Sequence, residues 1–331
     1  NNGKPRLRSA LAHYMNGLYG TSRTKQNITV TASGMQGLAL TALALIDSGD
    51  RVVCIDPVWP NLGESFKIAG GQIDPTTLVA RDGRWHLDME QLLAKLTDKT
   101  KALLINSPNN PTGWVCSAEE QKSILDHCRK QGIWIVSDDV YARLYQHGSL
   151  APGFQHLANA DDLLISINSF SKAWSMTGWR LGWITAPAAL EKTLAQLTEF
   201  NIACPAGFIQ EAGLAMIEQG EGEISLLQHR LRKALTLTRT RLKHFEDISF
   251  IEPDGAFYCF FSVRGLTDSL AFAHALLEQT KVGLAPGLAF GAAGGGCLRL
   301  CYAQDEQLLN KAFDRLDKGF NTVRRSLLED N

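Results

Sequence analysis

The first two-thirds of the chain alternates apolar runs of strand length with amphipathic segments of helix length. The apolar, β-rich runs cover residues 51–55, 101–106, 133–136, 163–168 and 181–186. Helical spacing of apolar residues lies between several of these runs. The clearest such helix is expected to start after Ser117, a good capping residue, and to stop at Gly132. Near-continuous apolar strands separated by helices predict a mostly parallel sheet that is covered on both faces.

The pattern changes around Pro187. Long helical patterns dominate residues 190–245, with an interruption at Pro205-Ala206-Gly207, and short strands then follow at 256–263 and 297–302. Two more helices are expected, at about 268–280 and 306–328. We therefore predict an α/β fold in three parts: a large domain over residues 1–190, a connecting helical region over 191–245, and a small α+β domain over 246–331.

Composition narrows the class of protein. The 331 residues are 45% hydrophobic and 20% charged, with a formal net charge of −1. This balance gives no basic field for nucleic acid, and no apolar run approaches the roughly 20 residues that cross a bilayer. The seven cysteines are scattered, and we interpret them as small buried hydrophobic residues of a cytoplasmic protein. The histidines lack zinc-site spacing, so we expect no metal.

Polar side chains follow three of the predicted strands. In open α/β sheets, ligands bind beyond the carboxyl ends of the strands. Asn110 follows the run at 101–106, Asp138 and Tyr141 follow 133–136, and Lys172 follows 163–168. Each residue alone has an ordinary structural explanation as part of a turn, a helix cap or a solvated surface. Together they predict one crevice that is lined by Asn, Asp, Tyr and Lys.

Taken in order, these segments resemble the class I and II aminotransferases among the fold-type-I enzymes that use pyridoxal phosphate (PLP). The matching blocks are Asn110-Pro111-Thr112-Gly113, Asp138-x-x-Tyr141, Ser169-x-Ser171-Lys172, Gly178-Trp179-Arg180, Pro286-Gly287-x-x-Phe290-Gly291 and Arg299. The likeness runs from about Gly3 to the C-terminus. It implies a large domain with a mostly parallel sheet, a smaller α+β C-terminal domain, and a homodimer with active sites at the interface.

The resemblance assigns catalytic roles to Lys172, Asp138 and Tyr141. Lys172 would hold PLP as a Schiff base and then move a proton to and from the substrate. Asp138 would keep the pyridine nitrogen protonated, which the electron-withdrawing chemistry of the ring requires. Asn110 and Tyr141 would bind the phenolic oxygen, and Trp59 would stack on the ring.

The same resemblance supplies an anion site and a substrate clamp. Arg180, Ser169 and the helix start at Ser33-Gly34-Met35 are expected to bind the cofactor phosphate. Arg299 lies in an apolar strand, an expensive place for an unpaired charge, and would clamp the substrate α-carboxylate. Asn110 and Trp59 are also expected to contact the substrate.

The sequence from Met176 to Trp183 resembles the corresponding segment of transaminases. We therefore predict the transfer of an amino group from an amino acid to a 2-keto acid, as part of amino acid metabolism. Two alternatives stay open: a PLP-dependent carbon–sulfur lyase acting by β-elimination, and an aminotransferase-like sensor domain of a transcription regulator. The segment 204–210 is neutral, and Met35 stands where some relatives have a lysine. A neutral or apolar amino donor is therefore expected.

The family also carries an N-terminal segment that closes over the substrate. It includes a tyrosine that reaches the phosphate of the neighbouring subunit, and it lies just before the region that matches Gly3. The sequence begins too late to include this segment.

Overall fold

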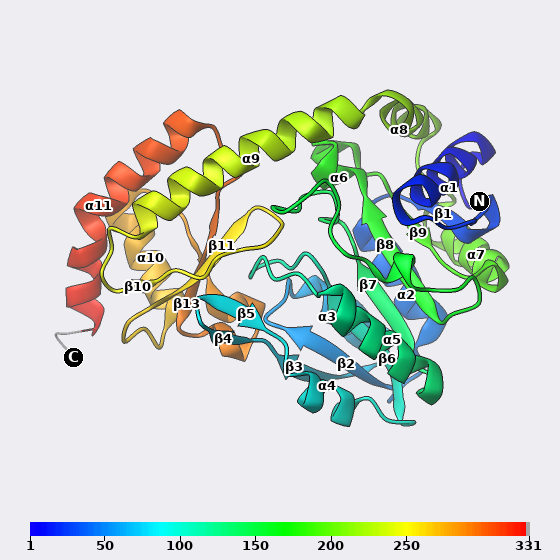
Figure 1. Cartoon of the computed structure of the whole chain (residues 1–331), viewed down its shortest axis with the longest axis horizontal. Helices are drawn as coiled ribbons and strands as arrows, with labels where there is room; N and C mark the ends of the chain where they lie inside the picture. Colours follow the sequence, from blue (N-terminus) through cyan, green and yellow to red (C-terminus); the bar gives the residue numbers. More distant parts are fainter. Residues whose placement is uncertain (329–331) are drawn as a thin grey trace.

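A seven-stranded sheet forms the centre of the larger part of the protein (Figure 1). The structure is a computed structural model that describes residues 1–328. The strand order is β1-β9-β8-β7-β6-β2-β3. Strand β9 runs antiparallel to both of its neighbours, and the other pairs are parallel. The strands are β1 (Ile28–Thr31), β2 (Arg51–Asp56), β3 (Gln72–Thr77), β6 (Thr100–Asn106), β7 (Trp134–Asp138), β8 (Leu164–Ser169) and β9 (Gly182–Thr185).

Helices cover both faces of this sheet, as the apolar strands predict. Alternate strand residues point to opposite faces, so Val52 and Cys54 enter one core and Val53 and Ile55 the other. The first core packs under α2 (Gly34–Leu45), α3 (Asn61–Ile68) and α7 (Glu191–Ile202), and the second under α4 (Met89–Lys95) and α5 (Ala118–Gln131). Helices α1 (Pro5–Tyr19) and α8 (Gly207–Gln219) pack at the β1–β9 edge.

Helix α5 begins and ends where the sequence predicts. Ser117 accepts a hydrogen bond from the Glu120 amide at 3.2 Å, and the Glu120 carboxylate accepts one from the Ser117 amide at 2.7 Å. This capping box satisfies two donors at the helix start. Gly132 ends the helix in the left-handed conformation with φ 69°, which favours glycine.

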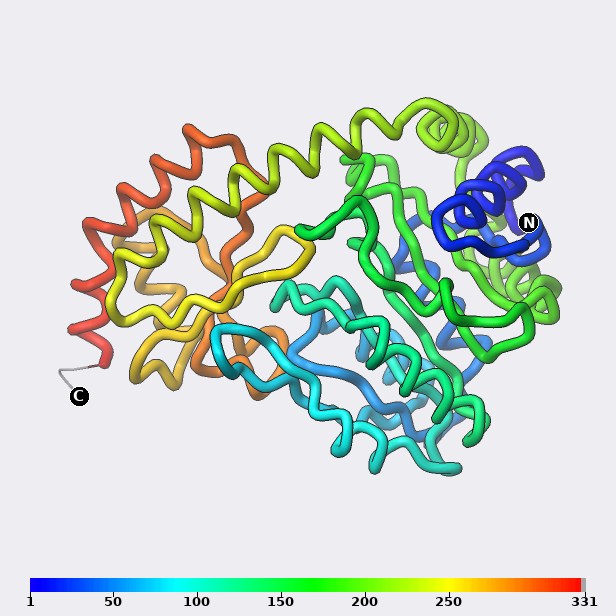
Figure 2. The backbone as a smooth tube through the Cα atoms, in the orientation of Figure 1, coloured from blue at the N-terminus to red at the C-terminus, as the bar shows by residue number. Residues whose placement is uncertain are grey.

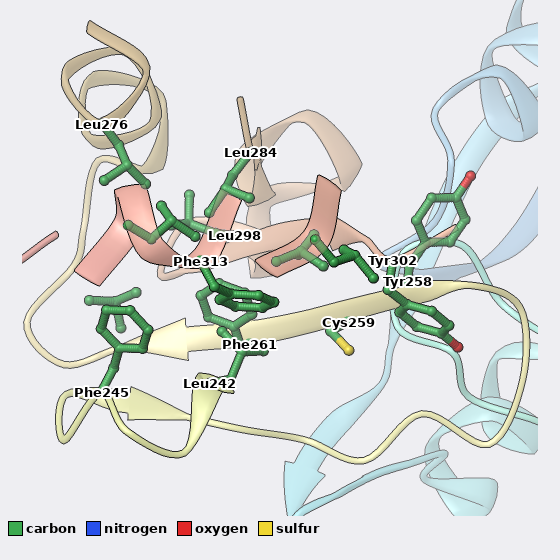
Figure 3. Close-up of a cluster of buried hydrophobic side chains, with 14 of the residues drawn as sticks. Leu242, Phe245, Tyr258, Cys259, Phe261, Leu276, Leu284, Leu298, Tyr302 and Phe313 are labelled. Carbon is green, nitrogen blue, oxygen red and sulfur yellow. The ribbon is translucent and has the colours of Figure 1, made fainter. Parts of the chain in front are cut away.

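A second, antiparallel sheet forms the smaller part. Its order is β10 (Ile248–Ser249), β11 (Tyr258–Val263), β13 (Cys297–Cys301) and β12 (Ala285–Pro286). Helices α10 (Ser269–Thr280) and α11 (Glu306–Leu328) pack against it around buried side chains such as Phe261, Leu276 and Phe313 (Figure 3). The long helix α9 (Glu221–Leu242) runs from the helices of the large sheet to this smaller part (Figures 1 and 2).

The remaining elements are short. Strands β4 (Val79–Arg81) and β5 (Arg84–His86) form a hairpin, and α6 (Phe170–Ala173) follows β8. Turns of 3-10 helix lie at Lys25–Asn27, Phe154–His156, Thr177–Trp179, Ala188–Leu190, Gly287–Phe290 and Ala292–Gly294. No helix within residues 1–328 combines the length and the apolar character that crossing a membrane requires.

The predicted fold class is confirmed: a large α/β part with a mostly parallel sheet and a smaller antiparallel part with helices. The exact domain limits stay a prediction. The expectation that the cysteines are buried is wrong at two positions, Cys204 and Cys301. Cys204 lies in the turn between α7 and α8, and Cys301 ends β13, so neither is enclosed on all sides.

Candidate active site

A cavity of about 330 Å³ opens at the carboxyl ends of β6, β7 and β8, beside the start of α2. Arg299 and Tyr258 reach it from the small sheet. Every residue that the sequence predicts for the site lines this cavity: Ser33, Gly34, Met35, Trp59, Asn110, Asp138, Tyr141, Ser169, Lys172, Arg180 and Arg299. The structure therefore brings the whole predicted set together, while the roles of its members stay predictions.

Lys172 is held in the short helix α6, directly after β8. Its Nζ lies 5.5 Å from the ring centroids of both Tyr141 and Phe257, so the amine is walled by two aromatic faces. Burial lowers the pKa of Lys172, and the nearby Asp138 carboxylate opposes part of that shift. A lowered pKa increases the fraction of neutral amine, which is the nucleophilic and proton-accepting form.

Asp138 ends β7 with its side chain inside the protein, only 4% exposed. Its carboxylate accepts a hydrogen bond from the Val140 amide at 3.3 Å, and its backbone carbonyl accepts one from Asn106 at 2.9 Å. Burial raises the pKa of Asp138 to about 7, with a smaller contribution from Asp139. One long amide bond leaves this buried carboxylate with capacity for a further, positively charged donor.

The neighbouring Asp139 is bound in a different way. Its carboxylate accepts hydrogen bonds from the hydroxyls of Ser137 and Ser166, and it does not line the cavity. Burial raises the pKa of Asp139 to about 6, and the two serine hydroxyls oppose that rise. Two adjacent buried carboxylates thus have different partners, and only Asp138 faces the cavity.

Asn110 is the centre of a local network. Its amide donates to Asn106 Oδ1 at 2.8 Å, and its carbonyl accepts from the Trp59 amide at 2.8 Å. Its side-chain Oδ1 accepts from Arg299 Nη1 at 2.8 Å. These bonds fix the Asn110 loop against β6, the Trp59 segment and the small sheet at once.

The start of α2 has the form of an anion site. The amides of Gly34 and Met35 are in the first helical turn and have no carbonyl partner within the helix. Ser33 caps the helix with φ 143°, a strained value for a residue other than glycine. A Cβ on Gly182 would lie 2.7 Å from the Gly34 nitrogen, so only glycine at 182 allows this approach.

Ser169 and Arg180 complete that side of the cavity. Ser169 is buried, with its hydroxyl 3.0 Å from that of Ser171. Arg180 is exposed, adopts φ 54°, and donates to the Thr177 carbonyl at 2.7 Å. The cavity thus has a donor set that suits a phosphate group. It consists of the hydroxyls of Ser169 and Ser171, the amides at the start of α2 and the Arg180 guanidinium.

The Arg299 guanidinium lies between two aromatic rings. Its central carbon is 4.4 Å from the Tyr258 ring centroid and 4.7 Å from that of Phe290. Among the described residues, none accepts a hydrogen bond from Arg299 Nε, which is buried. The guanidinium is thus oriented by packing and by Asn110, with donors left for a carboxylate.

Sequence reasoning missed six residues that also line the cavity: Leu38, Asn106, Val140, Ser171, Thr177 and Tyr258. Asn106 and Val140 carried a signal, because Asn106 ends a predicted strand and Val140 lies between Asp138 and Tyr141. Tyr258 carried none, since it reaches the cavity only through the packing of the two sheets.

The family model described as aminotransferase class I and II matches residues 1–316. An aspartate aminotransferase of Pyrococcus horikoshii is 33% identical over 96% of this chain and 81% of that protein. A probable aspartate/prephenate aminotransferase of Aquifex aeolicus is 30% identical over 97% of this chain and 82% of its own.

Solved structures are similar over nearly the whole chain. The aspartate aminotransferase of Thermotoga maritima superposes with a TM-score of 0.89 at 32% identity, covering 97% of this chain and 83% of the other. An alanine aminotransferase of Pyrococcus furiosus superposes at 0.90 with 26% identity, covering 97% and 83%. The relatives therefore differ in the amino acid that their names specify.

Proposed function

The chain belongs to the class I and II aminotransferase family, and we propose that it moves the amino group of a neutral or apolar amino acid to a 2-keto acid with PLP as cofactor. The observation that carries the proposal is the meeting of Lys172, Asp138 and Arg299 in one cavity. When bound, PLP supplies an aldehyde that captures amino groups and a ring that withdraws electrons from them.

The residues of the cavity fit this cofactor. Lys172 would hold it as a Schiff base, and Asp138 would pair with the pyridine nitrogen, for which its buried carboxylate has capacity. The start of α2, Ser169 and Arg180 would bind the phosphate. Trp59 would lie on the ring, held in place by the bond from its amide to the Asn110 carbonyl.

The chain's own groups account for the proton transfers that amino transfer requires. The lowered pKa of Lys172 favours its neutral amine. This amine can take a proton from the substrate α-carbon and deliver it to the cofactor. The aromatic walls of Tyr141 and Phe257 limit where that amine can move. Arg299 would bind the α-carboxylate and so fix which substrate bond faces Lys172.

Charge in the cavity supports a donor with an uncharged side chain. Among the described residues, the cations that line it are Lys172, Arg180 and Arg299, and each already has a role in this proposal. The remaining wall includes Met35, Leu38 and Trp59. A second carboxylate would enter this wall without a cation to pair with, at a cost in binding.

We further propose a homodimer. Phe200 and Phe208 flank the turn between α7 and α8 and are 83% and 74% exposed, and Trp179, beside Arg180, is half exposed. Large apolar side chains that are exposed on the surface suit a protein interface. Light scattering on the eluting peak of a gel-filtration column should give twice the chain mass, and a monomer at micromolar concentration would contradict the proposal.

We also assign the enzyme to the cytoplasm. The seven cysteines are all unpaired, which suits a reducing compartment. Cell fractionation with an antibody tests this assignment, and recovery in a secreted fraction would contradict it.

Absorption spectroscopy tests the activity. Purified protein with PLP is mixed with one amino acid at a time and no keto acid, using leucine, phenylalanine, alanine, aspartate and glutamate. Neutral donors should convert the lysine-bound cofactor to its pyridoxamine form faster than the acidic donors do. Aspartate as the fastest donor would overturn the donor class. In a separate reaction with cysteine, whose thiol can leave from the β-carbon, release of ammonia, pyruvate and sulfide would indicate a lyase.

A further inference from the structure

Tyr258 begins β11 and is 6% exposed, with its side chain at the end of the small-sheet core (Figure 3). It lines the same cavity as Lys172. Its strand neighbours on β13 include Cys301 directly and Arg299 diagonally. The tyrosine is thus part of the small sheet but faces the chemistry of the large one.

Two contacts of Tyr258 reach separate parts of the site. Its hydroxyl lies 3.2 Å from the hydroxyl of Tyr141, which follows β7 in the large part. Its ring face lies 4.4 Å from the central carbon of Arg299. One side chain therefore contacts both the residue proposed to bind the cofactor's phenolic oxygen and the residue proposed to bind the substrate carboxylate.

The number of protons on the two hydroxyls determines which of them donates to the other. Each phenol has one proton to donate. If Tyr141 donates its proton towards the cavity, its oxygen can only accept from Tyr258. A hydroxyl that accepts a hydrogen bond becomes a stronger donor in turn, because chains of hydrogen bonds polarise one another.

We propose that Tyr258 is a positioning residue with two separable functions: its hydroxyl donates to Tyr141 and strengthens that residue as a donor, and its ring holds the Arg299 guanidinium in place. The inference rests on the proposed function, since it acts on the PLP and carboxylate sites named there. The Arg299 guanidinium lies over the Tyr258 ring, and this positive charge makes the Tyr258 hydroxyl a better hydrogen-bond donor towards Tyr141.

Two substitutions separate the functions. Tyr258→Phe keeps the ring and removes the hydroxyl, whereas Tyr258→Leu removes both. Tyr302→Phe is the matched control: Tyr302 is a buried tyrosine of the same part of the protein, with its hydroxyl bonded to Gln146 and the Ala256 carbonyl, and it does not line the cavity.

The first measurement is the pH titration of the lysine-bound cofactor absorption, without substrate. A weaker donor at Tyr141 stabilises the ionised phenolic oxygen less, so the Schiff base should hold its proton to higher pH. We expect Tyr258→Phe to raise its pKa by about half a unit. Tyr302→Phe should leave that pKa within the error of the wild type.

The second measurement is the affinity for 4-methylpentanoate, a carboxylate without an amino group. Tyr258→Phe should bind it within about twofold of the wild type, and Tyr258→Leu about three- to tenfold more weakly, because the cation–π contact is lost.

Three results decide the matter. An unchanged pKa in Tyr258→Phe overturns the hydroxyl function, and equal carboxylate affinity in Tyr258→Phe and Tyr258→Leu overturns the ring function. A wild-type protein with no lysine-bound absorption would instead overturn the proposed function, and this inference with it.

Discussion

Replacing Asp138 by asparagine should slow amino transfer while leaving the cofactor-free protein folded. The substitution keeps the shape of the side chain and removes its negative charge. Asp138 is buried and its carboxylate accepts a single long bond from a backbone amide. Among the described residues, no other carboxylate lines the cavity, so none can replace its negative charge. The proton on a pyridine nitrogen beside residue 138 would then lose its charge-assisted partner.

The size of the effect follows from that one interaction. A hydrogen bond to a charged group contributes about 1.5–3 kcal/mol, which corresponds to roughly one to two pKa units of the ring nitrogen. If this full amount is lost in the transition state, the half-reaction should slow by about 10- to 150-fold. Thermal stability without cofactor should not fall, because a buried carboxylate with a raised pKa is itself costly.

The assay is a single-turnover half-reaction, followed by the loss of the lysine-bound absorption after mixing with leucine. Asp139→Asn is the matched control, because it removes a buried carboxylate one residue away that faces Ser137 and Ser166 rather than the cavity. A PLP analogue with a permanently methylated, cationic ring nitrogen should recover rate in Asp138→Asn. A wild-type rate in Asp138→Asn, or an equal loss in Asp139→Asn, would contradict this role of the Asp138 charge.

Three further predictions concern specificity and stability. Met35→Lys adds a cation to the cavity wall, so the ratio of kcat/KM for aspartate over leucine should rise about 10-fold or more, and an unchanged ratio would place Met35 away from the substrate side chain. Burial raises the pKa values of Asp138 and Asp139 to about 7 and 6 from the ordinary value of 3.8. Over this range the native state therefore binds more protons than the unfolded state, so the Tm of the cofactor-free protein should fall as the pH rises from 4 to 7. The Tm of the double variant with asparagine at both positions should fall less over the same range. An equal fall in Tm would contradict the burial argument. Arg23 is only 8% exposed, and burial lowers its pKa more than the nearby Asp162 carboxylate raises it. Arg23→Met should therefore raise the Tm by about 2 °C in calorimetry, whereas a clear drop would mean that the attraction to Asp162 outweighs the cost of burial.

Local signals in the sequence were sufficient for the limits of two helices, α5 and α11. Ser117 and Gly132 bound α5 because capping depends on residues within one turn of the helix end. Helix α11 covers Glu306–Leu328, the range that its apolar spacing predicts. The meeting of Asn110, Asp138 and Lys172 in one cavity was also predictable, because parallel strands end at one edge of a sheet and these residues follow those ends.

Features that depend on tertiary packing were not predictable. The apolar run at 181–186 gave no sign that β9 is antiparallel, since direction depends on how residues 170–181 return to the sheet. The approach of Tyr258 to Tyr141, 117 residues earlier, depends on how the two sheets pack. The exposure of Cys204 and Cys301 likewise depends on what the fold leaves uncovered.

Locating the cofactor on the chain tests the proposed active site most directly. Purified protein is incubated with PLP, the Schiff base is reduced with borohydride, and the digested protein is analysed by mass spectrometry. We expect one stoichiometric phosphopyridoxyl adduct, on Lys172, which is lost in Lys172→Ala. An adduct on a different lysine, or none at Lys172, would contradict the assignment of the cavity as the active site.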